Sequence, residues 1–293
     1  MESARCKAFL AAVETGSLSR AAQRLSYTPS GVSQLVTALE QELGFPLLLR
    51  SNKGVHPTAD GERLLPVVRE YLLQEERLYQ EAAETRGLMK GSITVASYTS
   101  VTANWLPEVI GAFQKDYPQV EVNMLGGSRR PAVQSLEEKR ADMAIFSHQE
   151  PMLYDWIPLA EIPMLAVLPK DHPLAGEAAY PLSHCSQERF IMPDQGWDED
   201  VVAMFEKNGI KPGSQYITPE NFTALSLIEQ GLGMSIMNEL VTRNWACDVV
   251  KLPLDPPASI TMGLAVPSLE RASPAVKKFA KYVVEHLTQK ETV

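Results

Sequence analysis

Cysteine is scarce in this chain of 293 residues, which has three scattered cysteines at Cys6, Cys185 and Cys247. No Cys-x-x-Cys pair occurs, and no histidine stands at metal-ligand spacing from a cysteine. The pattern is therefore not that of a zinc site or a dithiol redox motif. It indicates reduced and buried thiols.

Long apolar runs are missing too. No run approaches the ~20 residues that a membrane-spanning helix needs, and Met1 is followed by the polar Glu2, Ser3 and Arg5 rather than by a signal-peptide core. The composition, 45% hydrophobic and 22% charged, is normal for a soluble globular protein. We expect a cytoplasmic protein without a membrane role, long enough for two domains.

A net positive charge is also missing, because the formal net charge of the chain is -9. The charge is unevenly divided, however. Up to Thr58 there are six basic and four acidic residues, so the remainder carries a net charge of -11. This asymmetry permits a nucleic-acid-binding module joined to an acidic partner, but it is weak support on its own.

Catalytic motifs are absent as well, since no histidine stands in a recognisable nucleophile, metal or phosphate-loop motif. We therefore expect no catalytic residues, no metal site and no cofactor. The five histidines are His56, His148, His172, His184 and His286.

What the chain does have is a clear pattern of apolar residues at helical spacing, with capping residues between them, at its start. Apolar residues at helical spacing predict a first helix over residues 5–13, which Gly16 ends. Ser17 or Ser19 can cap a second short helix that runs to Leu25.

A third helix is predicted from Pro29 to about Leu43, because Thr28 is a good cap, proline suits the first position and Gly44 breaks the pattern. One stripe of this helix follows three- and four-residue steps, which predicts burial. The stripe consists of Val32, Leu35, Val36, Leu39 and Leu43.

The opposite face of the third helix carries Ser30, Gln34, Thr37 and Gln41. These are uncharged donors and acceptors. They suit the major groove of DNA, where glutamine reads adenine through two hydrogen bonds and serine or threonine contacts bases or phosphates. An ordinary solvated polar face is the alternative for this helix taken alone.

A short strand at residues 47–49, a turn at 50–54 and a return at 55–56 predict a β-hairpin wing. Basic side chains there would supply the sequence-independent attraction to phosphates that the third helix lacks. The basic side chains are Arg50, Lys53 and His56.

Thr58 can cap a long helix whose apolar stripe continues toward Arg86, with Pro66 a candidate bend. Such a stripe needs a partner, and a second copy of the chain is the economical one. A symmetric dimer would place two reading helices on successive turns of a palindromic site. Gly87 and Gly91 end the helix and mark a hinge.

From Ser92 onward short apolar strands alternate with helices, which predicts parallel sheets covered on both faces. Strands are expected at residues 93–96, 120–124, 142–146, 164–168, 190–192, 216–217, 234–237 and 260–266. Helices are expected at residues 105–117, 132–139, 201–207, 223–230 and 275–287.

Taken together, these residues resemble the LysR-type transcriptional regulators over nearly the whole chain. The match is densest in the first sixty residues: Phe9, then 15–25, 28–34, 39–44, 47–50 and 57–61. Later segments resemble the effector region of the family: 106–107, Phe113, 117–118, 142–145, 169–174 and 230–234.

The resemblance implies a multidomain α+β protein. Its parts are a winged helix-turn-helix at 1–58, a dimerising linker helix at 59–90 and a two-lobed α/β effector domain that resembles periplasmic binding proteins. Lobe I would comprise 91–161 and 267–293, and lobe II 162–266. The implied partners are double-stranded promoter DNA, a small-molecule effector and the chain itself as a homodimer or homotetramer. RNA polymerase is a further candidate.

The resemblance places DNA contacts on the reading helix and the wing. Many relatives carry arginine or lysine on the outer face of the reading helix, whereas this chain has Ser33, Gln34 and Thr37. Affinity would then depend on the wing and on doubled sites in an oligomer. The expected DNA-binding residues are Thr28, Pro29, Ser30, Ser33, Gln34, Thr37, Arg50, Lys53 and His56.

The effector would lie in the cleft between the lobes, held by strand-to-helix loops and helix amino termini. Ser100 or Thr102 can instead merely cap the next helix, and Arg129 and Arg130 either balance an anionic ligand or are solvated. Small organic acids and amino acids are favoured. The expected effector-binding residues are Ser97, Thr99, Ser100, Gly127, Ser128, Phe146, Ser147, Pro193, Asp194, Thr218 and Asn221.

Three rival hypotheses remain open at this point. The two-lobed domain could be an enzyme, or a solute-binding protein that acts without DNA. A DNA-binding regulator could also use no effector, or a redox signal through Cys185 and Cys247, which requires their α-carbons to lie within ~7 Å.

Overall fold

The computed structural model describes residues 2–51, 54–86, 89–196, 198–213, 215–243 and 245–288. Contacts divide the chain into two compact units. The first contains the chain up to Gly91 together with Glu137–Arg140, and the second contains Ser92–Leu136 and the chain from Ala141 onward. No helix among the described residues is long and apolar enough to cross a membrane.

Three helices begin the first unit: α1 (Ser3–Thr15), α2 (Leu18–Leu25) and α3 (Pro29–Leu43). The local signals work as predicted. The Ser17 side chain accepts a hydrogen bond from the Arg20 N–H, and the Thr28 side chain accepts one from the Gly31 N–H. The α3 stripe is buried at Val32, Val36 and Leu39. It packs in one core with Cys6, Phe9 and other residues of α1 and α2.

The wing is a two-stranded antiparallel hairpin, β1 (Leu48–Ser51) and β2 (Gly54–Pro57), with Arg50 opposite Val55. The hairpin is attached to the helices because the Val55 N–H donates to the Gly16 carbonyl at 3.0 Å. Lys53 lies outside the described residues.

The linker helix α4 (Ala59–Glu84) starts at Thr58, whose hydroxyl accepts from the Gly61 N–H at 2.9 Å. Pro66 lies inside the helix. Three large apolar side chains of α4 are exposed, namely Val67, Leu78 and Tyr79.

In the second unit, an eight-stranded sheet runs in the order β4-β3-β5-β12-β6-β11-β7, and β10 also pairs with β6. Its main strands are β3 (Gly91–Tyr98), β4 (Val120–Gly127), β5 (Met143–Ser147), β6 (Asp155–Pro169) and β12 (Ser259–Val266). The expectation of parallel pairing holds for β3 with β5 but is wrong for β12, which is antiparallel to both β5 and β6. The long strands β6 and β12 carry the chain back across the sheet, so no crossover helix is needed there.

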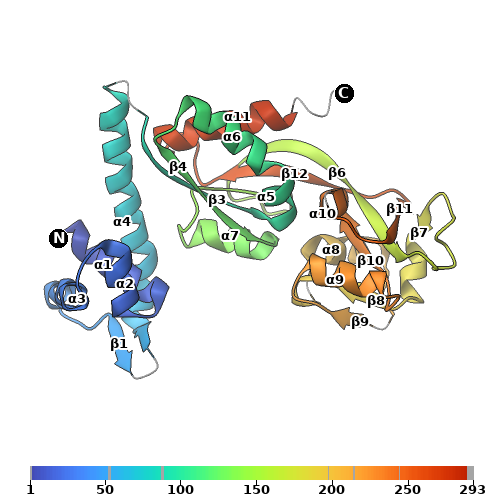
Figure 1. Cartoon of the computed structure of the whole chain (residues 1–293), viewed down its shortest axis with the longest axis horizontal. Coiled ribbons are helices and arrows are strands. Elements are labelled where there is room, and N and C mark those ends of the chain that lie inside the picture. Colours follow the sequence, from blue (N-terminus) through green and yellow to red (C-terminus); the bar gives the residue numbers. More distant parts are fainter. Residues whose placement is uncertain are drawn as a thin grey trace. The chain divides into compact units, whose positions relative to one another are not determined.

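The helix expected at residues 105–117 is in fact preceded by a separate short helix, α5 (Thr99–Asn104), before α6 (Leu106–Asp116). The carboxy-terminal helix α11 (Pro274–Thr288) lies beside α6 (Figure 1), and the Phe113 and Phe279 rings meet edge to face at 5.0 Å. Helix α7 (Arg129–Glu137) follows β4.

The remaining elements of the second unit pack around the carboxy-terminal half of β6. The parallel pair β8 (Phe190–Met192) and β9 (Gln215–Ile217) lies with α8 (Glu199–Asn208), α9 (Asn221–Glu229) and α10 (Glu239–Arg243) (Figure 1). Along β6, Ile162 pairs with β12 but Met164 pairs with β10 (Ser235–Asn238). Strand β11 (Val249–Asp255), which was not predicted, pairs with the same half of β6 and with the short β7 (Tyr180–Pro181). This change of partner lies between Pro163 and Met164, near the predicted lobe boundary at 161/162. The division into lobes stays a prediction.

Candidate functional site

The outer face of α3 is open and polar. Ser30 and Gln34 are exposed, while Ser33 and Thr37 are half-buried. At its start, the hydroxyls of Thr28 and Ser30 lie 3.1 Å apart, and Pro29 is exposed between them. The structure therefore brings the predicted α3 residues together on one accessible surface.

The arginine of the wing belongs to this surface as well. The Arg50 guanidinium donates to the Ser33 hydroxyl at 2.8 Å and to the Thr37 hydroxyl at 3.4 Å. It also lies 4.0 Å from a carboxylate oxygen of Glu40, which accepts the N–H groups of Leu47 and Leu48. The wing and the reading helix thus form one connected polar surface, and His56 is exposed on the adjacent strand.

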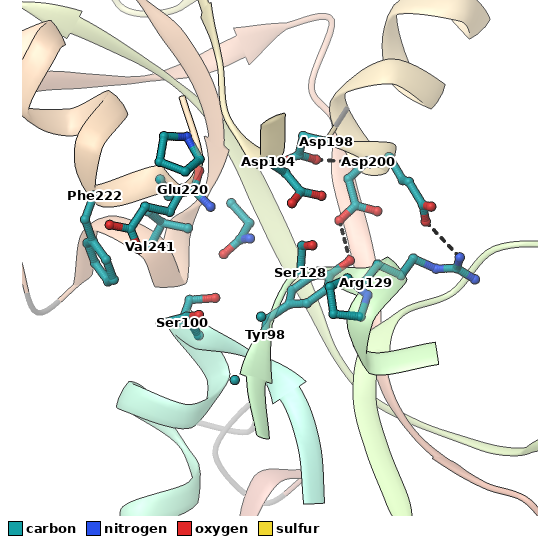
Figure 2. A pocket seen from close by; sticks show the side chains of 18 of the residues that line it. Tyr98, Ser100, Ser128, Arg129, Asp194, Asp198, Asp200, Glu220, Phe222 and Val241 are labelled. Carbon is teal, nitrogen blue, oxygen red and sulfur yellow. Dashed lines mark hydrogen bonds and ion pairs between the residues drawn. The ribbon is translucent and has the colours of Figure 1, made fainter. Parts of the chain in front are cut away.

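A cavity of about 350 Å³ opens in the second unit where β3, α5, α7, α8, α9 and α10 converge (Figure 2). This volume is in the range of small-molecule sites. Six of the eleven predicted effector residues line it: Thr99, Ser100, Gly127, Ser128, Asp194 and Asn221.

The other five predicted effector residues do not line the cavity, because the fold uses their side chains elsewhere. Ser97 is buried and its hydroxyl lies 2.7 Å from that of Thr102. The Thr218 hydroxyl donates to the Glu220 carbonyl. Phe146, Ser147 and Pro193 are buried behind the lining.

One wall of the cavity is held by a half-buried carboxylate. Asp200, in the first turn of α8, accepts hydrogen bonds from the Tyr98 hydroxyl at 2.9 Å, the Ser147 hydroxyl at 2.6 Å and the Gln149 amide at 3.2 Å. Burial, then the nearby Asp200, raises the pKa of Tyr98, so its phenol stays a proton donor. This network ties the ends of β3 and β5 to α8.

Arg129 is neither solvated nor free to balance an anion, contrary to both expectations. Its Nη1 lies 2.9 Å from the Glu199 carboxylate, and its Nε donates to the Ser147 carbonyl at 3.2 Å. The guanidinium also lies 5.3 Å from the centre of the Phe146 ring. Arg130 is exposed.

The pKa of a second acidic residue of this region, Asp198, is also shifted. The Asp198 carboxylate caps α8 by accepting the N–H groups of Asp200 and Val201 at 3.1 and 3.2 Å. Burial, followed by the proximity of Asp200, raises the pKa of Asp198 to about 7. The cavity therefore holds a carboxyl group that titrates near neutral pH.

Both units match models of known protein families. Residues 4–62 match the family model of the bacterial regulatory helix-turn-helix protein, lysR family, and residues 86–288 match that of the LysR substrate binding domain. The chain belongs to the LysR family. It is a LysR-type transcriptional regulator with an effector-binding domain.

Individual relatives of the regulator agree with this assignment. It is 31% identical over 282 residues to the transcriptional regulator YvbU of Bacillus subtilis. The alignment covers 95% of this chain and 96% of YvbU. A full-length OxyR variant from Pseudomonas aeruginosa superposes with a TM-score of 0.74 at 18% identity, covering 99% and 98% of the two chains. The effector-binding domain of QuiR in complex with shikimate superposes with a TM-score of 0.60 at 22% identity, and the superposition covers 68% of this chain and 98% of that domain. The two solved structures show a shared fold.

Sequence reasoning missed several lining residues of this LysR-family regulator, above all Tyr98, Asp198, Asp200 and Asn238. A signal was present for α8, because Asp198 is a good cap before the helix at 201–207. Tyr98 stands between the predicted Ser97 and Thr99 at the end of the same strand, but its own contact was not predicted. No local signal was present for Asn238, which reaches the cavity only through the sheet order.

The redox alternative is not favoured in this regulator. Cys185 and Cys247 are both free. Burial, as the largest cause, raises the pKa of the Cys185 thiol to about 12, whereas reactive cysteines have lowered values. Among the described residues, no group of three or more potential metal ligands lies together.

Proposed function

We propose that this regulator reads promoter DNA through the outer face of α3 and that a small molecule in the cavity of the second unit alters that binding. The observation that carries the DNA half is the joined polar surface of Ser33, Thr37 and Arg50 beside the exposed Gln34. Glutamine and hydroxyl groups supply base-edge hydrogen bonds, and arginine supplies phosphate contacts.

The effector half is supported by the cavity itself. It is bordered by loops and helix starts from separate parts of the chain, so a ligand there would change how those elements hold together. The QuiR domain, which shares the fold, is bound to shikimate in its solved structure. We assign Thr99, Ser100, Gly127, Ser128, Asp194 and Asn221 as ligand-contacting residues.

A homodimer or homotetramer is part of the proposal. Val67, Leu78 and Tyr79 of α4 are 61%, 67% and 61% exposed, which is costly for large apolar side chains unless a partner covers them. A second α4 is the proposed partner, and doubled reading helices would compensate for the lack of basic side chains on α3. The protein would act in the cytoplasm on promoter DNA, with RNA polymerase as a further candidate partner.

Fluorescence anisotropy with duplexes from the chain's own genomic neighbourhood tests this function. The full chain should bind at least one such duplex more tightly than random DNA, with an affinity that falls as salt rises. Sedimentation of the free protein should show a dimer or a tetramer. A strict monomer, or equal binding to every duplex at low ionic strength, would contradict the proposal.

A further inference from the structure

The lining of the effector cavity is strongly acidic. Its charged side chains among the described residues comprise one basic group, Arg129, and five acidic ones. The acidic residues are Asp194, Asp198, Glu199, Asp200 and Glu220. A carboxylate ligand would enter a field of its own sign unless the arginine faced it.

Arg129 does not face the ligand space. Its side chain is 16% exposed and is paired with Glu199 at 2.9 Å. Figure 2 shows the guanidinium directed away from the centre of the cavity, toward the acid to which a dashed line joins it. The cavity thus has no cation in position to receive an anionic group among the residues that the structure describes.

The acidic residues differ in whether other groups of the protein already pair with them or donate hydrogen bonds to them. Glu199 is paired with Arg129, Asp200 accepts the Tyr98 and Ser147 hydroxyls, and Asp198 caps α8. Asp194 has no ion pair in the described part of the chain, and its carboxylate points into the central space in Figure 2. Glu220 also has no ion pair among the described residues, but it is exposed, whereas Asp194 is half-buried. Asp194 is therefore the acid inside the cavity that is left to meet a ligand.

Two amide oxygens independently point to a missing donor. Asn238 lines the cavity with only 9% of its surface exposed, yet its buried Oδ1 has no hydrogen-bond partner in the described structure. The buried Oδ1 of Asn221, at the start of α9, lacks one as well. A buried acceptor without a donor is unfavourable, so a ligand rich in N–H groups would satisfy both.

The remaining lining suits the carbon skeleton of such a ligand. Phe222 and Val241 give the cavity an apolar side, and an aromatic face also attracts cations. The described residues offer no cluster of three or more potential metal ligands, which favours an organic cation over a metal ion.

We propose that the effector carries a cationic amino or guanidinium group, whose N–H donors bind the Asp194 carboxylate and the amide oxygens of Asn238 and Asn221. This inference rests on the proposed function, because it takes the cavity as the effector site. Among the chemistries expected from sequence, it retains amino acids and excludes simple organic acids.

Thermal unfolding of the full chain with probes of five or six carbons and different charge tests the proposal. 1,5-Diaminopentane, lysine and agmatine should raise the Tm by several degrees, whereas glutarate and 1,5-pentanediol at the same ionic strength should not. By calorimetry, Asp194→Asn should weaken binding of the best amine about tenfold or more, because it removes a charge-assisted hydrogen bond.

Asp171→Asn is the matched control, an exposed aspartate outside the cavity, and it should leave amine binding unchanged. Asn221→Ala, at a half-buried position, gives a second variant that should weaken amine binding even if Asp194→Asn fails to fold. Stabilisation by glutarate and not by the amines, or no stabilisation by any probe, would overturn the cationic assignment. Failure of the proposed function would be seen separately, as loss of selective DNA binding by the unmodified chain.

Discussion

The Tyr98 hydroxyl at the end of β3 donates a hydrogen bond of 2.9 Å to the Asp200 carboxylate in the first turn of α8, across 102 residues of sequence. The Ser147 hydroxyl lies 2.8 Å from the same phenol oxygen and donates to the same carboxylate. These three side chains connect α8 to the ends of β3 and β5 beside the cavity of the second unit.

Tyr98→Phe should destabilise the effector-binding unit by about 2 kcal/mol, the usual contribution of a hydrogen bond to a charged group. The ring keeps its packing, and only the donor to Asp200 is lost. Thermal unfolding measures the change. Tyr282→Phe removes a phenol that bonds Asp116 at the exposed surface, so it should have little effect; an equal loss in both variants would contradict the role assigned to Tyr98.

Asp198 should make the stability depend on pH. Its pKa is raised from 3.8 to about 7, chiefly by burial, so the folded chain binds this proton more tightly than the unfolded chain does. Stability is then greatest below pH 3.8 for this group and falls as pH rises toward 7. Between pH 5.5 and pH 8 the loss should be about 2 kcal/mol.

Asp198→Asn checks this assignment, because asparagine caps helices as well as aspartate does but carries no titrating proton. The Tm of the variant should vary much less between pH 5.5 and pH 8 than that of the unmodified chain. If the slope persists unchanged in the variant, another group is responsible for it.

Gly61 should tolerate no side chain. A Cβ atom there would lie 2.3 Å from the Leu47 carbonyl oxygen, because the wing passes against the start of α4. Gly61→Ala should therefore destabilise the DNA-binding unit by about 1–3 kcal/mol. Gly111→Ala in α6 is the matched control with nothing within 4 Å, and it should stabilise by about 0.5–1 kcal/mol. Chemical denaturation of each variant distinguishes the two signs.

Arg50→Ala should weaken binding to specific and random DNA alike, by about tenfold at low salt, and lower the slope of log K against log salt by about 1. The variant loses the charge and also releases the Ser33 and Thr37 hydroxyls. Arg50→Lys should keep the salt slope while losing the two-point contact with these hydroxyls. Arg271→Ala, an exposed arginine of the other unit, serves as the control; a fall in affinity confined to specific DNA would contradict the phosphate role.

Local chemistry explains which parts could be predicted from sequence. Helix α3 has the predicted bounds because its signals, Thr28, Pro29 and Gly44, act within a few residues. The six predicted residues that line the cavity likewise lie at or just after the ends of strands or at the starts of helices, which local patterns indicate. Asn238 could not be predicted, because its place in the cavity depends on β10 pairing with β6, some 70 residues earlier in the chain.

Side-chain pairing was the second limit on prediction. Ser147 was expected to bind the effector because it follows a strand, and Arg129, after a glycine-rich turn, was expected either to balance an anionic ligand or to be solvated. In the structure, Asp200 and Glu199 bind them instead. Only the three-dimensional position of α8 shows which acid meets which donor, and sequence patterns report periodicity rather than such long-range pairs.

Gln34→Ala should relax base preference rather than abolish DNA binding. Gln34 is exposed on α3, and a two-point contact from glutamine to adenine contributes about 1–3 kcal/mol of discrimination against the wrong base. Competition binding with single-base variants of the bound duplex measures this. Gln41→Ala is the matched control, an exposed glutamine two turns further along the same face, where the helix is farther from the bases if its amino-terminal end enters the groove. Equal losses on specific and random DNA for Gln34→Ala would show that this side chain supports general attachment instead of reading the sequence.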